Sequence, residues 1–281
     1  MSTAISVCHG EFGRATLYHL DKSLITHAHH EGHLIFLIEG SFSDVTVNST
    51  SNPIDLERAV AVSPLEPHSF NVRDGESCVV LTLYIKPIWF LENCQSAEFT
   101  LRFGSSKVVR TQAINVVVRR LTSMLLDGHN TEDIDTLLFS LSRLCYEQTW
   151  QSVSSPGLLQ NNCARFSDYR IRRSLRMMQQ SISAEVEMED VARAVGLSRP
   201  HFFKLFKKQL GVTPNVYLNI LRSERAIDDL INTEKTVTNI AYDLGYSSQA
   251  AFTRFFSSNV GIAPSEYRRV AEKPPGFIPI H

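Results

Sequence analysis

The last third of the chain contains an internal repeat, and this repeat constrains the fold more than any other feature. Segment 191–198 (VARAVGLS) resembles segment 240–247 (IAYDLGYS), and each is followed by an aromatic stretch with one basic residue, at 202–206 and 252–256. Each copy ends in the pattern G-x-x-P-x-x-Y, at 211–217 and 261–267. The offset between copies is 49 residues before the turn and 50 after it. Such self-similarity indicates a duplicated structural unit.

Each copy of the repeat predicts a helix-turn-helix unit. Gly196 and Gly245 suit the left-handed residue that ends a helix. The serine that follows each glycine, Ser198 or Ser247, can cap the next helix. That next helix has aromatic residues at helical spacing on one side and polar residues on the other, so it can pack on its partner and still enter a major groove. The aromatic and apolar residues expected to be buried are Phe202, Leu205 and Phe206, then Phe252, Phe255 and Phe256.

The first 105 residues predict a different class of structure. Short apolar or β-rich runs at 34–38, 45–47, 59–62 and 79–85 alternate with turn signals such as Asn52-Pro53 and Asp74-Gly75. Many short strands with frequent turns are typical of a small barrel or sandwich. The predicted fold class is therefore α+β with two domains: a β-barrel with a helix pair, then an all-α double helix-turn-helix.

The pattern changes to a helical period over 107–150. Apolar residues recur at i, i+3, i+4 and i+7 from Ile114 to Leu125 and from Ile134 to Cys145, on either side of the turn 127–130. This predicts an antiparallel helix pair, which either packs on the barrel or forms the interface of a homodimer. The expected boundaries are a domain over 1–150, a linker over 151–164 that is rich in Ser, Pro, Gly and Asn, and a second domain over 165–281.

The charge divides along the same boundary. Residues 165–281 contain 17 Lys and Arg against 12 Asp and Glu, whereas residues 1–164 contain 11 against 17. A basic half joined to an acidic half is consistent with a nucleic-acid-facing part and a part that faces something else, although ordinary surface variation can also produce so modest a difference.

The region 171–269 resembles the C-terminal domain of the AraC/XylS family of bacterial transcription regulators, on the motifs of the repeat just described. In that family a long helix joins the two units, and 214–231 fits it, because proline is permitted at a helix start and an apolar stripe follows. An 18-residue helix is about 27 Å long, close to the ~34 Å spacing of successive major grooves. The resemblance implies that the protein is a cytoplasmic, non-enzymatic regulator that binds double-stranded promoter DNA, and that contacts RNA polymerase if it is an activator.

The resemblance also assigns residues to the DNA interface. Lys204 and Arg254 can pair with guanine, Gln249 with adenine, and Thr253 can offer a methyl group to thymine. Pro200, Phe203 and Ala250 also fall at base-reading positions, and the apolar Pro200 and Phe203 depart from the polar residues common there. Arg199, Lys207 and Lys208 are expected to neutralise phosphates. Ser248 and Ser257 complete the exposed positions on the second recognition helix.

Histidines dominate the candidate site of the N-terminal half. His27, His29 and His33, with Gly40 downstream, resemble the first cupin motif, and His68 after Pro67 resembles the second. His33 replaces the usual acidic residue. The resemblance implies a cupin-like barrel that binds a small-molecule effector. The same histidines could instead ligate a divalent transition metal, because imidazole suits zinc, copper, nickel or iron.

Two further functions remain open from the sequence. One is a metal-dependent cupin enzyme fused to DNA-binding helices, which the missing acidic ligand disfavours. The other is alkyl transfer to Cys163, which needs an activated thiol. The five cysteines are scattered and form no CxxC pair, which fits a reducing compartment. The sequence shows no apolar run of about 18 residues and no secretory leader, so we expect no membrane association.

Overall fold

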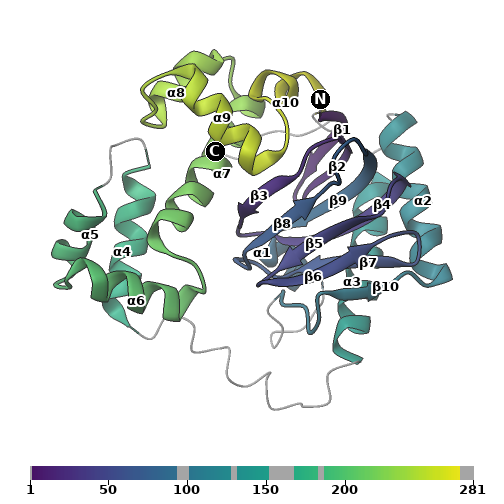
Figure 1. Cartoon of the computed structure of the whole chain (residues 1–281), viewed down its shortest axis with the longest axis horizontal. Helices are drawn as coiled ribbons and strands as arrows, with labels where there is room; N and C mark the ends of the chain where they lie inside the picture. The colour runs from purple at the N-terminus through teal and green to yellow at the C-terminus, as the bar shows by residue number, and fades with distance from the viewer. Residues whose placement is uncertain (1, 94–100, 128–131, 152–167, 183–186, 273–281) are drawn as a thin grey trace.

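The computed structural model describes residues 2–93, 101–127, 132–151, 168–182 and 187–272. Strands fill the first part of the chain and helices the last, as Figure 1 shows, which confirms the predicted α+β class. Residues 152–164 of the predicted linker, which include Cys163, and residues 128–130 of the predicted turn lie outside the described ranges, whereas Gln151 still belongs to a helix. Among the helices of those ranges, none has both the length and the hydropathy that crossing a membrane requires.

The N-terminal half is built from two β-sheets. The larger has the order β10-β7-β4-β9-β2-β1-β11, and the smaller has the order β3-β8-β5-β6. The strands of the larger sheet are β1 (Thr3–Gly10), β2 (Gly13–Leu20), β4 (Gly32–Gly40), β7 (Arg58–Val62), β9 (Cys78–Ile85), β10 (Lys107–Val109) and β11 (Ala271–Glu272). The smaller sheet contains β3 (Leu24–His27), β5 (Ser43–Val47), β6 (Thr50–Ile54) and β8 (His68–Asn71).

The larger sheet is buried on both faces, which explains why β4 has a continuous apolar run instead of an alternating pattern. Leu34 and Phe36 of β4 join the core beneath the helix pair. Ile35 and Leu37, on the opposite face of the same strand, join the core that also contains residues of the smaller sheet. β4 lies centrally, antiparallel to both β7 and β9.

The predicted helix pair covers one face of the larger sheet. It consists of α2 (Gln112–Asp127) and α3 (Glu132–Gln151), preceded by the short α1 (Pro87–Asn93). The apolar stripes of both helices, including Ile114, Leu121 and Leu138, are buried in the same core as Leu34. One boundary was wrong: residues 107–109 form β10 beside β7 and are not helical. The stripes that suggested a dimer interface therefore pack on the sheet.

The C-terminal half is helical and contains both predicted units. Its helices are α4 (Tyr169–Gln180), α5 (Met188–Ala194), α6 (Arg199–Leu210), α7 (Pro214–Asn232), α8 (Val237–Asp243), α9 (Gln249–Val260) and α10 (Pro264–Val270). Helices α5 and α6 form the first helix-turn-helix, and α8 and α9 form the second, with α7 between them as expected. Gly196 and Gly245 have φ values of 72° and 80°, so each turn uses the left-handed conformation that glycine allows.

The helix caps differ between the two units. Ser198 is the N-cap of α6, but its side chain makes no capping hydrogen bond. In the second unit the N-cap is Ser248, whose hydroxyl accepts a hydrogen bond from the backbone N–H of Ala251. The prediction of Ser247 was therefore wrong by one position, because the extra residue of the second turn moves the helix start.

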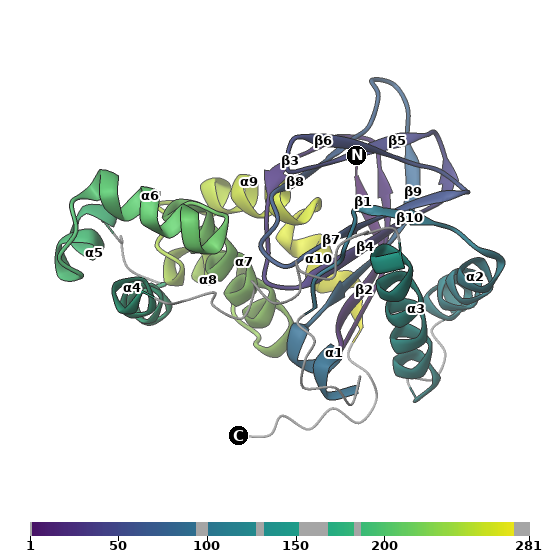
Figure 2. The same cartoon turned by 90° about the horizontal axis from the view of Figure 1, so that it is seen from below.

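The second helix-turn-helix unit packs directly on the β-half. Phe252, Phe256 and Tyr267 share one apolar core with Val7 and Leu20 of the barrel. Strand β11, which follows α10, pairs in parallel with β1 at the edge of the larger sheet. Figures 1 and 2 show α9 and α10 beside the strands, whereas α5 and α6 stand farther out. The two halves are thus joined through a common core as well as through the chain.

Candidate nucleic-acid interface and ligand pocket

Helix α6 presents a basic surface opposite its buried side. Phe202, Phe206 and Leu210 are buried, and they hold the helix on α5 and α7. Arg199, Pro200, Lys204, Lys207 and Lys208 are all exposed, as predicted from helical spacing. This surface provides four cations for an anionic partner.

Phe203 lies between the buried and the exposed sides of α6. It is half-buried, and its ring meets the edge of Phe202 at a centroid distance of 6.1 Å. The guanidinium of Arg199 lies over the same ring, 4.9 Å from its centroid. Phe203 therefore packs against both Phe202 and Arg199 and stays partly accessible.

Helix α9 presents a smaller and less charged surface. Gln249, Ala250 and Arg254 are exposed, whereas Ser248, Thr253 and Ser257 are half-buried. The Thr238 hydroxyl of α8 donates a 2.6 Å hydrogen bond to the side-chain oxygen of Gln249. That contact orients the Gln249 amide, a group that suits bidentate pairing with adenine.

A buried carboxylate at the end of α7 fixes α7 relative to α8. Asp229 is 2% exposed and lies 3.2 Å from Arg225 Nε and 3.5 Å from Lys235 Nζ. Lys235 also contacts Asp243 of α8 at 2.8 Å. The sequence pattern gave no indication of this network, because Asp229 falls within an otherwise ordinary helix. Its effect is to hold the second unit at a defined orientation on the connecting helix.

A cavity lies where the β-half meets α7 and the end of α9. Its volume is about 440 Å³, and its walls come from both halves of the chain. The apolar wall is made by Ile220, Ile227 and Ile231 of α7 and by Val260 of α9. The polar wall includes His9, Arg14, His27, His29, Glu31 and Lys86, together with Glu224 and Asp228. Cavities of this size between domains are typical ligand sites.

Arg14 is a buried cation of this cavity that no pattern in the sequence indicates. It is 6% exposed, and its guanidinium lies over the Tyr84 ring at 3.6 Å and donates to the Tyr267 hydroxyl at 3.4 Å. Its Nε has no hydrogen-bond partner among the described atoms. Burial opposes the charged form, but Tyr267, Tyr84 and Glu31 keep the pKa of Arg14 above its ordinary value. Arginine in a strand carries no sequence signal of burial.

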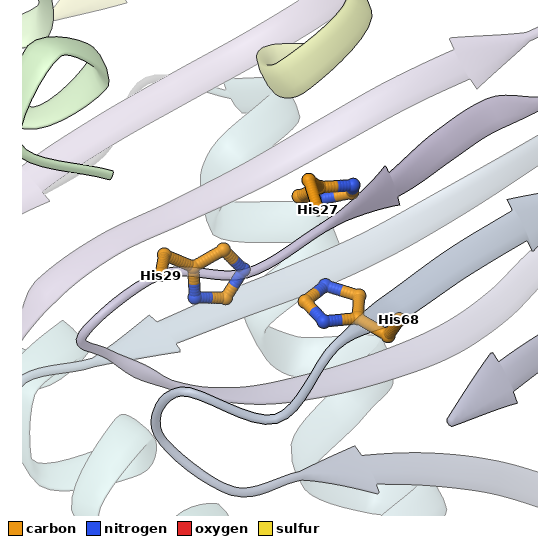
Figure 3. Close-up of side chains that lie close together, drawn as sticks. All are labelled: His27, His29 and His68. Atoms are coloured by element: carbon orange, nitrogen blue, oxygen red, sulfur yellow. The ribbon is translucent and has the colours of Figure 1, made fainter. Parts of the chain in front are cut away.

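The predicted histidines do come together in the β-half. The His27 and His68 ring centroids are 4.4 Å apart, and those of His29 and His68 are 4.9 Å apart (Figure 3). His33 Nδ1 lies 3.2 Å from His68 Nε2, and the His33 ring stacks on Tyr84. His27 and His29 line the cavity, whereas His33 and His68 are not among its lining residues. Burial lowers the pKa of all four imidazoles, which are therefore neutral at pH 7.

Segment 27–31 connects this cluster to the helical half. Ala28 is buried in the core of the first helix-turn-helix unit. The His30 ring meets Tyr217 of α7 at 5.2 Å, and its Nδ1 lies 2.6 Å from Glu224 Oε1. Burial opposes protonation of His30, but the hydrogen bond and charge of Glu224 and the charge of Glu31 raise its pKa.

Comparisons with known proteins agree with this architecture. A family model described as a helix-turn-helix domain matches residues 191–270. The chain is 39% identical over 83 residues to the lactose operon transcription activator of Staphylococcus xylosus, a match that covers 30% of each chain. It is 32% identical over 120 residues to the Transposon Tn10 TetD protein of Escherichia coli, covering 43% of this chain and 87% of that protein. The chain belongs to the AraC/XylS family.

Some solved structures resemble this chain over more than nine tenths of its length. An apo point variant of ToxT from Vibrio cholerae superimposes with a TM-score of 0.60 at 15% identity, covering 93% of this chain and 98% of that one. ToxT with an unsaturated fatty acid bound gives a TM-score of 0.58 at 19% identity, with coverage of 92% and 96%. At these identities the likeness concerns the fold, and it confirms the two-domain arrangement.

Membership of the AraC/XylS family places the chain among transcription regulators of that type. Residues 191–270 match the helix-turn-helix domain, and the chain spans about a third of the length of the lactose operon activator that it resembles. The alkyl-transfer hypothesis concerned Cys163, which lies outside the described residues, so it stays untested. Burial raises the pKa of the Cys78 and Cys145 thiols, the opposite of the activation that such chemistry needs.

Proposed function

We propose that this regulator binds a specific promoter sequence through 165–281 and that a small organic effector held by 1–150 controls this binding. The observation that carries the proposal is the cavity of about 440 Å³ whose walls come from both halves. A molecule in this cavity contacts the β-half and α7 at the same time. Its binding free energy therefore depends on how the DNA-binding helices sit on the barrel, which is the requirement for coupling between two sites.

The chemistry of the cavity favours a carboxylate with an apolar chain as effector. Arg14 supplies a buried cation with an unpartnered Nε, and Lys86 supplies a second cation at the wall. Isoleucines of α7 supply an apolar surface for the chain. The fatty acid bound to ToxT, a protein of similar fold, supports the same ligand class.

The DNA contacts follow from the exposed sides of α6 and α9. In this proposal Lys204 and Arg254 read guanine and Gln249 reads adenine, while Thr253 and Ala250 offer methyl groups to thymine. Phe203 and Pro200 supply apolar contacts from the first unit. Arg199, Lys207 and Lys208 neutralise phosphates, and Ser248 serves chiefly as the cap of α9.

A homodimer completes the proposal, with a contact to RNA polymerase if the protein is an activator. The outer side of α2 offers the exposed apolar residues Val116 and Leu126, at 52% and 57% exposure, beside Arg119 and Arg120. A second copy that covers this side would place two DNA-binding halves on one operator. Sedimentation of the full chain and of a Val116→Asp variant tests it: the variant should be monomeric where the parent protein is dimeric.

Oleate is the probe that tests the effector proposal. Oleate at 100 times its dissociation constant should stabilise the full chain by about 2.7 kcal/mol and change its affinity for a selected DNA site. Arg14→Gln and Lys86→Gln should each weaken oleate binding, whereas Lys107→Gln, at an exposed lysine of β10, should not. Absence of oleate binding to the full chain, or equal binding by all three variants, would remove the carboxylate effector from this cavity.

A further inference from the structure

We propose that His27, His29 and His68 form a binding site for one divalent first-row transition-metal ion, such as Zn²⁺, in the wall of the interdomain cavity. One ring nitrogen from each histidine lies within 4.8 Å of the others. The three residues are 7%, 9% and 2% exposed. His27 ends β3, His29 lies in the following loop, and His68 begins β8, so three separate parts of the β-half converge here (Figure 3). This site goes beyond the effector proposal and needs no organic ligand.

Hydrogen bonds to the backbone orient all three rings in the same way. Nδ1 of His27 lies 2.8 Å from the Ile25 carbonyl oxygen, Nδ1 of His29 lies 3.2 Å from that of Glu31, and Nδ1 of His68 lies 2.9 Å from that of Glu66. A carbonyl oxygen only accepts, so each Nδ1 carries the proton. In a neutral ring this leaves the lone pair on Nε2. Metal-binding histidines are typically held in this way by a carbonyl at the other nitrogen.

One of the three Nε2 atoms lacks a hydrogen-bond partner. His29 Nε2 is buried without a hydrogen bond to any described atom. His68 Nε2 has one neighbour, because His33 Nδ1 donates to it over 3.2 Å. A buried acceptor without a donor is uncommon in folded proteins and calls for an ion or a water molecule. A cation satisfies the lone pairs of all three rings at once.

Metal binding requires the three ring nitrogens to move closer to one another. A tetrahedral site with Zn–N bonds of ~2.1 Å keeps its nitrogens about 3.4 Å apart. Nitrogens that lie as far as 4.8 Å apart must therefore approach each other by about 1.4 Å when a metal ion binds. The His33–His68 hydrogen bond breaks in that step, which makes His33 a competitor for His68 and not a ligand.

The proposed site faces the cavity and touches the segment that joins the two halves. His27 and His29 line the cavity, so a fourth coordination position is open to water or to a donor atom of a bound molecule. His29 is followed by His30, which contacts Glu224 and Tyr217 of α7. Metal binding fixes the conformation of 27–31, and with it the contact between the barrel and the helix that connects the DNA-binding units.

Zinc binding to the chelator-treated full chain tests the proposal. Equilibrium dialysis should show one Zn²⁺ per chain at micromolar free metal, and Co²⁺ in its place should give the visible absorption of a tetrahedral site. His27→Ala and His68→Ala should each weaken Zn²⁺ binding by roughly 30-fold or more. His201→Ala, which removes an exposed histidine of α6, should leave it unchanged. His29→Asn serves as a further ligand variant if circular dichroism shows that either alanine variant is misfolded.

Replacement of His33 tests whether this residue is a metal ligand or only a neighbour of the ligand His68. His33→Phe keeps a ring against Tyr84 but removes the hydrogen bond to His68, so Zn²⁺ should bind at least as tightly as before. Loss of Zn²⁺ binding in this variant, or binding that survives both alanine variants, overturns the three-histidine assignment. Failure to bind Zn²⁺ at micromolar concentration overturns the site itself. Oleate and DNA binding are measured independently, so these results do not decide the effector proposal.

Discussion

The imidazole Nδ1 of His30 lies 2.6 Å from Glu224 Oε1, and this pair joins the loop after β3 to the middle of α7. The two side chains are 32% and 36% exposed, so solvent screens part of their attraction. The importance of this contact comes from its position. It links segment 27–31, which contains the cavity-lining His27 and His29, to α7, the helix between the two helix-turn-helix units.

A double-mutant cycle on this pair should give a small but measurable coupling. His30→Ala combined with Glu224→Ala should show an interaction free energy of roughly 0.5–1 kcal/mol in urea unfolding. The same cycle on Arg143 and Glu147, which are 63% and 51% exposed within α3, should give less. Equal values for the two pairs would show that the interdomain contact has no special stability.

The common core predicts that the two halves unfold together. Phe256 and Tyr267 of the second unit are buried with Val7 and Leu20 of the barrel. Calorimetry of the full chain should therefore show these parts in one transition, and Phe256→Ala should destabilise that transition by about 3–5 kcal/mol. Tyr242→Ala, at an aromatic residue of α8 that is 58% exposed, is the matched control. Two well-separated transitions, with only one affected by Phe256→Ala, would contradict the common core.

The Asp55 carboxylate should make the free energy of unfolding depend on pH, and the direction of the effect can be worked out. Burial alone would raise its pKa, but hydrogen bonds from Arg58 and from the Glu57 N–H hold the pKa below its ordinary value. A lowered pKa stabilises the fold above the unfolded pKa of ~3.9, and this contribution is lost as the pH falls through the folded value. Asp55→Asn should lower the free energy of unfolding by about 1 kcal/mol at pH 7. The difference between the variant and the parent protein should shrink below about pH 4. Urea unfolding across this pH range measures it, and a pH-independent cost would contradict stabilisation by the ionised carboxylate.

Lys207 and Lys208 should contribute affinity without sequence preference. Both are exposed near the end of α6, beyond the residues expected to reach the bases. Alanine at either position should lower the slope of log K against log salt by about 1 and weaken binding to all DNA sequences alike. Anisotropy titrations at several salt concentrations measure this slope. A loss confined to one DNA sequence would instead make the residue a base-reading one.

The sequence predicted the helical half well because its signals are local. A glycine in the turn, a proline at a helix start and aromatic residues at helical spacing each act within a few residues, so Gly196 and Phe202 could be placed without the tertiary structure. The capping serine of α9 was missed by one position, because an extra residue in a turn can be absorbed on either side of it.

The sequence could not reveal contacts between distant segments. The pairing of β11 with β1 joins residues that are more than 260 positions apart, and two residues of strand carry almost no pattern. Arg14 was missed because its burial depends on Tyr84 and Tyr267, which approach it only in the folded chain. The histidines were found as a group through motif spacing, but only the structure separates cavity-lining His27 and His29 from the deeper His33 and His68.

Selection of bound sites from a random DNA pool tests the central claim most directly. The full chain should enrich one motif with two contact regions about one helical turn apart, one for each recognition helix. Lys204→Ala should relax the motif in one region and Arg254→Ala in the other, each with a loss of about 1–3 kcal/mol on the selected site. Enrichment of no motif, or of an unchanged motif by both variants, would contradict DNA reading by α6 and α9.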